Sequence, residues 1–173
     1  RYLLFNNKIY LLPDTHYPLL SGGVGGLADD HLLPQSREPI AFAFSDRFSE
    51  AYSLNSLSDF TVTLADKGWE LKPANSQLSA DDLQSWVDAW RYARAVYIEQ
   101  SVPKLSGKEQ LIKISFKDGS NIDYAVIEKH TSSALYRADI GLLYHLTAAT
   151  LTDITAAPRI KPAAVDAQAA PDA

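Results

Sequence analysis

The chain has 173 residues, of which 46% are hydrophobic and 21% are charged, a composition that is typical of an ordinary globular protein. Its net charge of −5 argues against a nucleic-acid binder, which needs a basic surface, and against simple adhesion to an anionic membrane. The absence of cysteine excludes disulfides, Cys-ligated zinc and thiol catalysis, but it is compatible with either cytosol or periplasm.

The sequence contains no methionine, so we expect that Arg1 is not a translation start and that any signal peptide or membrane anchor lies upstream. From Arg1 to Leu12 the pattern predicts a hairpin, because Asn6 and Asn7 tolerate the positive φ of a two-residue type I′ turn. A glycine-rich stretch at residues 21–26, SGGVGG, predicts a flexible loop. Residues 27–33 could form two helical turns that Pro34 ends.

Alternation of apolar and small or polar residues predicts strands at 40–44, 60–64 and 69–71. Residues 79–97 have the pattern of the main helix. Ser79 and Asp82 fit a capping box at its start. One face is apolar and carries two tryptophans one turn apart: Leu83, Trp86, Val87, Trp90, Arg94 and Tyr97.

Arg94 interrupts this apolar face and has two interpretations. Its stem could cover Trp90 while the guanidinium reaches water. Alternatively, the side chain could be buried and directed at an anion or a partner carboxylate.

After a loop at 103–109, residues 111–117 and 122–129 predict two strands joined at Asp118-Gly119, a strong hairpin signal. A third strand is expected at 134–138, and helical spacing returns between Ile140 and Leu151. From Ala157 onward the Ala- and Pro-rich sequence predicts a tail that does not fold independently.

These elements predict an α+β fold, an antiparallel sheet of hairpins with one main helix on one face. The helix should pack through the tryptophan face onto a layer that contains Phe60, Val62, Trp69, Ile112, Ile114, Phe116, Ile122 and Tyr124. A weak internal echo relates the hairpin at 2–20 to the segment at 124–146. We therefore expect repeat-like units: residues 1–39 as the C-terminal part of a preceding unit, 40–155 as a complete unit, and 156–173 as the tail.

No motif in the sequence requires a particular reaction. Gly23 to Ala28 fits G-x-G-x-x-A, with Asp46 at the distance of a ribose-binding acid, but Pro34 leaves too little helix for a parallel crossover. Asp29-Asp30-His31 offers metal ligands, yet three consecutive residues rarely converge on one ion. We therefore predict no catalytic residue, no metal and no cofactor. The binding residues that we predict are Arg94 and the loop glycines Gly22, Gly23, Gly25 and Gly26.

The order of these parts resembles the DUF4340 family of bacterial proteins. The resemblance rests on KIYLL-PDTHYPLL, the glycine-rich segment, ADDHLLP, GWEL, the W-x-x-x-W helix and the strand–DG–strand pair, and it covers residues 1 to about 155. It implies repeated α+β units behind an N-terminal anchor, on the periplasmic side of the inner membrane. Some relatives accompany ABC transporter components, and the family supplies no catalytic residues.

Three functions stay open at this point. The first is a non-enzymatic accessory or interaction domain for other envelope proteins, ABC transporter components among them. The second is a module that binds a small ligand or an envelope glycan through exposed Tyr and Trp. The third is an enzyme of a type that its sequence does not reveal.

Overall fold

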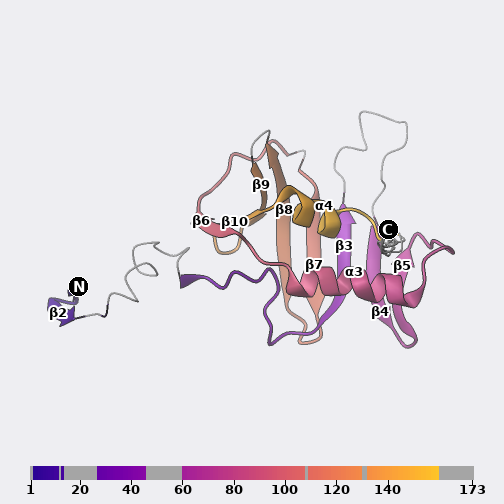
Figure 1. Ribbon diagram of the computed structural model, residues 1–173, viewed down its shortest axis with the longest axis horizontal. Coiled ribbons are helices and arrows are strands. Elements are labelled where there is room, and N and C mark those ends of the chain that lie inside the picture. Colours follow the sequence, from indigo (N-terminus) through magenta and orange to yellow (C-terminus); the bar gives the residue numbers. More distant parts are fainter. Residues whose placement is uncertain are drawn as a thin grey trace, which may run out of the picture.

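The computed structural model describes residues 2–11, 13, 27–45, 60–107, 109–129 and 132–159. Most of its strands form one eight-stranded sheet, in the order β5-β4-β3-β7-β8-β9-β10-β6, and both helices with described bounds lie on one face of it (Figure 1). In chain order the elements are β1 (Tyr2–Phe5), β2 (Lys8–Leu11), β3 (Pro39–Ser45), β4 (Phe60–Ala65), β5 (Gly68–Lys72), α3 (Ala80–Tyr92), β6 (Tyr97–Gln100), β7 (Leu111–Phe116), β8 (Asn121–Lys129), β9 (Ser132–Arg137), β10 (Leu142–Leu146) and α4 (Ala148–Thr155).

Every pair of neighbouring strands in the described part of the chain is antiparallel. The α+β class, with a sheet of hairpins and a helix packed on it, is therefore confirmed. The division into repeat units is not tested by this architecture and stays a prediction.

Strands β5 and β6 form the two edges of the sheet, and the chain builds the β5 edge before the β6 edge. A β3-β4-β5 meander builds one edge, and α3 then carries the chain across the face to the opposite edge, where β6 lies (Figure 1). From β6 the chain returns to β7 beside β3, and a β7-β8-β9-β10 meander fills the gap back to β6. Strand β6 is thus flanked by β10 and forms the outer edge.

The N-terminal hairpin is confirmed. Asn6 and Asn7 have φ values of 47° and 59°, as a type I′ turn requires, and Phe5 pairs with Lys8 across it. Strands β1 and β2 form a two-stranded sheet of their own, which lies apart from the eight-stranded sheet in Figure 1.

Helix α3 begins as predicted but ends earlier. Ser79 accepts a hydrogen bond from the backbone of Asp82, and the Asp82 carboxylate accepts one from the backbone of Ser79, which completes the capping box. The predicted extension to Tyr97 is wrong, because Ala93 is already extended with φ −62° and ψ 133°. Residues 93–95 bond to residues 30–32 instead, and this tertiary pairing is invisible in the helical spacing.

Two other helical predictions are wrong. Residues 28–33 are not helical; the backbone of Leu32 bonds to Ala93, and the side chains of Leu32 and Leu33 are buried in the core. The segment from Ile140 to Leu151 is divided into strand β10 and helix α4, which starts at the N-cap Thr147. Helical spacing was misleading at β10, because all five of its side chains are buried and the strand lacks polar alternation.

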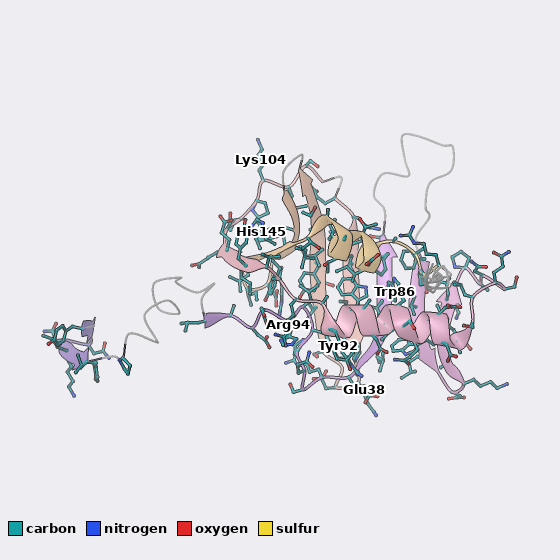
Figure 2. The ribbon with its side chains drawn as sticks, viewed as in Figure 1. Glu38, Trp86, Tyr92, Arg94, Lys104 and His145 are labelled. Atoms are coloured by element: carbon teal, nitrogen blue, oxygen red, sulfur yellow. The ribbon has the colours of Figure 1, made fainter. Side chains whose placement is uncertain are left out.

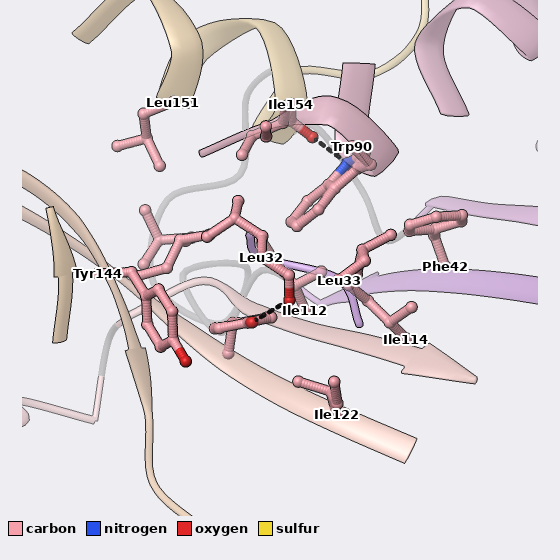
Figure 3. Close-up of a cluster of buried hydrophobic side chains, with 14 of the residues drawn as sticks. Leu32, Leu33, Phe42, Trp90, Ile112, Ile114, Ile122, Tyr144, Leu151 and Ile154 are labelled. Atoms are coloured by element: carbon pink, nitrogen blue, oxygen red, sulfur yellow. Dashed lines mark hydrogen bonds between the residues drawn. The ribbon is translucent and has the colours of Figure 1, made fainter. Parts of the chain in front are cut away.

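The core between the helices and the sheet is built around the tryptophans, as predicted. Trp90 is fully buried, and Figure 3 shows it in the cluster with Phe42. Its ring contacts those of Phe42, Phe44, Trp86 and Tyr124. All eight predicted facing residues belong to this cluster or pack against it. Seven of them are buried, and Trp69 is partly buried.

A second cluster lies on the opposite face of the sheet. Residues Ala125, Ile127, Ala134, Tyr136 and Leu143 are all buried there, because they alternate along β8, β9 and β10 with the residues that face the helices. The sheet is therefore apolar on both faces across β8, β9 and β10.

Candidate functional site

From β3 to α4, the four most exposed large apolar side chains among the described residues lie between residues 92 and 102. Tyr92 ends α3, Val96 precedes β6, Tyr97 is the first residue of β6 and Val102 follows the strand, with exposed fractions of 68%, 68%, 56% and 78%. At the opposite edge, the β4–β5 hairpin contributes only Leu64 to the large exposed apolar side chains, among the residues that the structure describes. We call Val96, Tyr97 and Val102 together with the outer backbone edge of β6 the β6 edge surface.

The backbone of this region shows which side of β6 is available. Val96 N–H donates to the carbonyl of His145 on β10, at 2.8 Å. Ala95 N–H points the other way, to the carbonyl of Asp30, also at 2.8 Å. Residues 30–32 thus cover the outer side just before β6, and within the described part of the chain no strand continues this pairing along Tyr97–Gln100.

On the outer face of the sheet, β6 and β10 share an aromatic and ionic group. The rings of Tyr97 and His145 stack at a centroid distance of 4.0 Å and an interplanar angle of 12°. His145 is 8% exposed, and its Nε2 lies 3.2 Å from the Glu99 carboxylate. Tyr97 therefore presents one flat ring face to solvent while its other face covers the histidine.

Beside the end of α3 lies the polar cluster that the sequence singles out at 29–31. His31 Nδ1 is 2.7 Å from Asp29 Oδ1 and 3.3 Å from Asp30 Oδ1, so these consecutive side chains do converge, contrary to expectation. The His31 backbone N–H, followed by its ring, holds the pKa of Asp29 below its ordinary value. The Arg94 guanidinium lies 3.7 Å from Asp30 and supplies a cation there, so the carboxylates already have protein partners.

A second set of polar contacts involves Tyr124 on β8 and Arg137 at the end of β9. The Tyr124 hydroxyl donates to the Leu32 carbonyl at 2.6 Å, and burial raises the pKa of Tyr124 well above its ordinary value. Arg137 forms a two-pronged ion pair with Asp139, at 3.0 and 2.9 Å. Burial acts to lower the pKa of Arg137, but hydrogen bonds to Asp139 outweigh it, so the net shift is upward. The Tyr124 hydrogen bond therefore anchors the Leu32 segment to the sheet.

The predicted binding residues are not brought together in what the structure describes. Arg94 is 61% exposed and lies in the extended segment after α3 (Figure 2), so its predicted place on the helix face and the buried interpretation are wrong. Its guanidinium reaches water, as the other interpretation expected, and lies 3.7 Å from the Asp30 carboxylate. Gly22, Gly23, Gly25 and Gly26 lie outside the described residues. Whether Arg94 binds a ligand stays a prediction.

Sequence reasoning missed strand β6 altogether. The predicted helix included Tyr97 as its last residue, and residues 98–100 were assigned to no element, whereas all four form the strand. The β-branched and aromatic run from Val96 to Ile98 was the available signal, because three such residues in succession favour a strand over a helix.

The chain was compared with family models, with curated proteins and with solved structures, and none of the three comparisons found a match. The resemblance to the DUF4340 family therefore stays a prediction. Within the described part of the chain, neither helix has the length and apolar character that crossing a bilayer demands.

Proposed function

We propose that this chain is a non-enzymatic interaction domain of a membrane-anchored bacterial protein, on the periplasmic side of the inner membrane. In this proposal it serves as an accessory to a membrane complex such as an ABC transporter. The compartment and the class of partner rest on the family resemblance. The β6 edge surface is the observation that supports an interaction role.

The physical argument for this surface has two parts. An edge strand presents backbone N–H and C=O groups to which another chain can add, and proteins usually protect such edges with charge, proline or a covering segment. This edge is partly protected, because residues 30–32 cover the backbone just before β6 and the strand carries exposed Glu99 and Gln100. The side chains of Val96, Tyr97 and Val102 beside it are nevertheless apolar and exposed. Strand addition takes affinity from main-chain hydrogen bonds and specificity from alternate side chains, and this surface offers both.

The experiment is affinity capture from detergent-solubilised bacterial envelopes with three forms of the chain: wild type, Tyr97→Asp and the matched control Leu64→Asp at the opposite edge. Both substituted positions are exposed, so both variants should fold like the wild type by circular dichroism. We expect membrane-complex components to co-purify with the wild type and with Leu64→Asp, and to be lost with Tyr97→Asp. An identical set of proteins on all three forms would contradict the proposal.

The compartment has its own test. A fusion of the natural protein to alkaline phosphatase, which is active only outside the cytoplasm, should be active. An inactive fusion that is produced at a normal level would contradict the periplasmic assignment.

A second candidate function is the binding of an envelope glycan. The solvent-facing ring of Tyr97, held flat against His145, is the kind of platform on which sugar rings stack. Trp86 and Trp90 do not contribute, because they are only 7% and 0% exposed. A thermal-shift screen with peptidoglycan fragments and other envelope sugars should show stabilisation that Tyr97→Ala abolishes; no shift with any sugar would count against this function.

A further inference from the structure

We propose that the Asp118-Gly119 peptide in the turn between β7 and β8 is a modification site, at which the chain rearranges to an isoaspartyl linkage, and that the folded turn slows this rearrangement. The inference lies outside the proposed interaction role, because it concerns the covalent chain itself. Asp118 is the only aspartate that glycine follows, and no asparagine precedes a glycine. Glycine leaves the backbone nitrogen after Asp118 unhindered, since it has no side chain.

The rearrangement needs only the chain and water. The backbone nitrogen of Gly119 attacks Cγ of Asp118. A bond forms between these two atoms, and one water molecule leaves with the amide proton and the hydroxyl of the neutral carboxyl group. Water then opens the resulting five-membered succinimide ring. Cleavage of the new N–Cγ bond restores aspartate, whereas cleavage between the nitrogen and the backbone carbonyl carbon of Asp118 leaves the chain running through the side chain.

The product matters because it changes the length of the main chain at a central hairpin. It adds one methylene group to the backbone between β7 and β8, which lie in the middle of the sheet. Ile114 and Ile122 face each other across this hairpin, and both are buried in the core. Turn geometry helps to set strand register, so the modification acts on the pairing of two core strands.

The folded turn restrains the attacking nitrogen. Gly119 N–H donates to the carbonyl of Phe116 at 2.9 Å, and Phe116 N–H donates to the carbonyl of Ser120, also at 2.9 Å. The attack requires that the Gly119 nitrogen lose its proton and turn toward Cγ of Asp118. Both steps break the hydrogen bond to Phe116, so the closed turn opposes them.

The turn also restrains the carboxyl group that is attacked. Oδ1 of Asp118 accepts hydrogen bonds from the Ser120 hydroxyl and from the Ser120 backbone N–H, the latter at 2.9 Å, and Oδ2 lies 3.5 Å from Nε of Arg37. The bond from the Ser120 hydroxyl, followed by that from its N–H, lowers the pKa of Asp118. The carboxylate is therefore kept charged, whereas ring closure requires the neutral acid. The Asp118 side chain is 51% exposed, so these bonds give the protection, and exclusion of water does not.

The rate of isoaspartate formation in the folded and the unfolded chain tests the site. The whole chain is incubated at mildly acidic pH in buffer and in guanidinium chloride, and isoaspartate is measured by enzymatic methylation and located by peptide mapping. In denaturant we expect it to accumulate at Asp118 ahead of the other aspartates. In buffer the rate at Asp118 should be at least about tenfold lower, because the hydrogen bonds of the turn must break first. Equal rates in both media, or no isoaspartate at Asp118 in denaturant, would overturn the proposal.

Two serine variants test whether the bonds to Asp118 give the protection. Ser120→Ala removes the hydroxyl that donates to Asp118. Ser115→Ala is the matched control, because it removes a hydroxyl of the same hairpin that donates to Asn121 at 2.8 Å and leaves the bonds to Asp118 intact. We expect Ser120→Ala to raise the rate in buffer about tenfold and Ser115→Ala to leave it unchanged, with all forms alike in denaturant. No rise for Ser120→Ala, or an equal rise for both variants, would overturn the protective role of these bonds.

Discussion

The indole nitrogen of Trp90 donates a hydrogen bond to the backbone carbonyl of Ile154, at 2.8 Å, and so joins α3 to α4 inside the core (Figure 3). Trp86 repeats the contact one turn earlier, to the carbonyl of Ala156 at 3.1 Å. The two tryptophans therefore do more than fill the layer between helix and sheet. Each also supplies the donor for a carbonyl at the C-terminal end of α4, where helix carbonyls have no partner within the helix.

We expect Trp90→Ala to lower the free energy of unfolding by about 3–5 kcal/mol, because it removes a fully buried ring and leaves a cavity. Trp90→Phe should cost less, about 1–3 kcal/mol, since the ring is largely kept and the Ile154 carbonyl loses its donor. Urea unfolding followed by circular dichroism measures both. Tyr92→Ala, at an exposed position of the same helix, is the control and should change stability by less than about 0.5 kcal/mol. A loss under about 1 kcal/mol for Trp90→Ala would show that this helix face is not core.

Tyr124→Phe tests the attachment of the Leu32 segment to the sheet. The substitution keeps the ring and removes the hydroxyl that donates to the Leu32 carbonyl at 2.6 Å. A buried carbonyl without a donor costs about 1–3 kcal/mol, so stability should fall by that amount. Chemical denaturation provides the measurement, with Tyr92→Phe as the exposed control. Equal stability of both variants would mean that the Leu32 segment does not depend on this bond.

Gly119 should be sensitive to substitution for conformational reasons alone. It closes the turn between β7 and β8 with a φ of +82°, and a Cβ atom there would meet no atom within 4 Å. Gly119→Ala should therefore cost about 1–2 kcal/mol through backbone strain. Gly119→Asn should cost less, because Asn tolerates this region better than other residues. Thermal unfolding compares the two, and an alanine variant as stable as wild type would contradict the left-handed conformation.

Glu109 should give stability a dependence on acid pH. Its carboxylate accepts hydrogen bonds from the backbone N–H and the side-chain hydroxyl of Ser106 and from the backbone N–H of Gly107. Together these bonds lower the pKa of Glu109 from 4.5 to about 2, and the bond from the Ser106 N–H makes the largest contribution to this shift. Because the folded pKa lies below the unfolded one, the stabilisation is complete above pH 4.5 and is lost as the pH falls through about 2.

An NMR titration of the Glu109 carboxyl measures this pKa directly, and a midpoint near 4.5 would contradict the hydrogen-bonded geometry. The matched variant is Glu109→Gln, which cannot ionise. We expect it to be less stable than wild type at neutral pH, and we expect the difference to shrink as the pH falls through about 2, because the wild-type carboxyl becomes neutral there.

The amino-acid sequence alone determined the elements whose signals are local. A capping box starts α3 at Ser79, two asparagines turn the first hairpin, and Asp118-Gly119 turns the β7–β8 hairpin. Alternation and helical spacing also identified the two faces that meet in the core, from Trp86 and Trp90 to Ile114 and Tyr124. Such features depend on residues a few positions apart, so the pattern contains all that is needed to find them.

The tertiary structure decided where α3 stops, that Tyr97–Gln100 is a strand, and that Arg94 faces solvent. Each of these depends on partners distant in sequence: Asp30 and Leu32 bond to residues after α3, and β10 pairs with β6. A short edge strand gains most of its stability from such pairing and little from its own residues, so the β-branched and aromatic run at its start was only a weak signal. The candidate site was hidden for the same reason, since an edge exists only once the order of the strands is known.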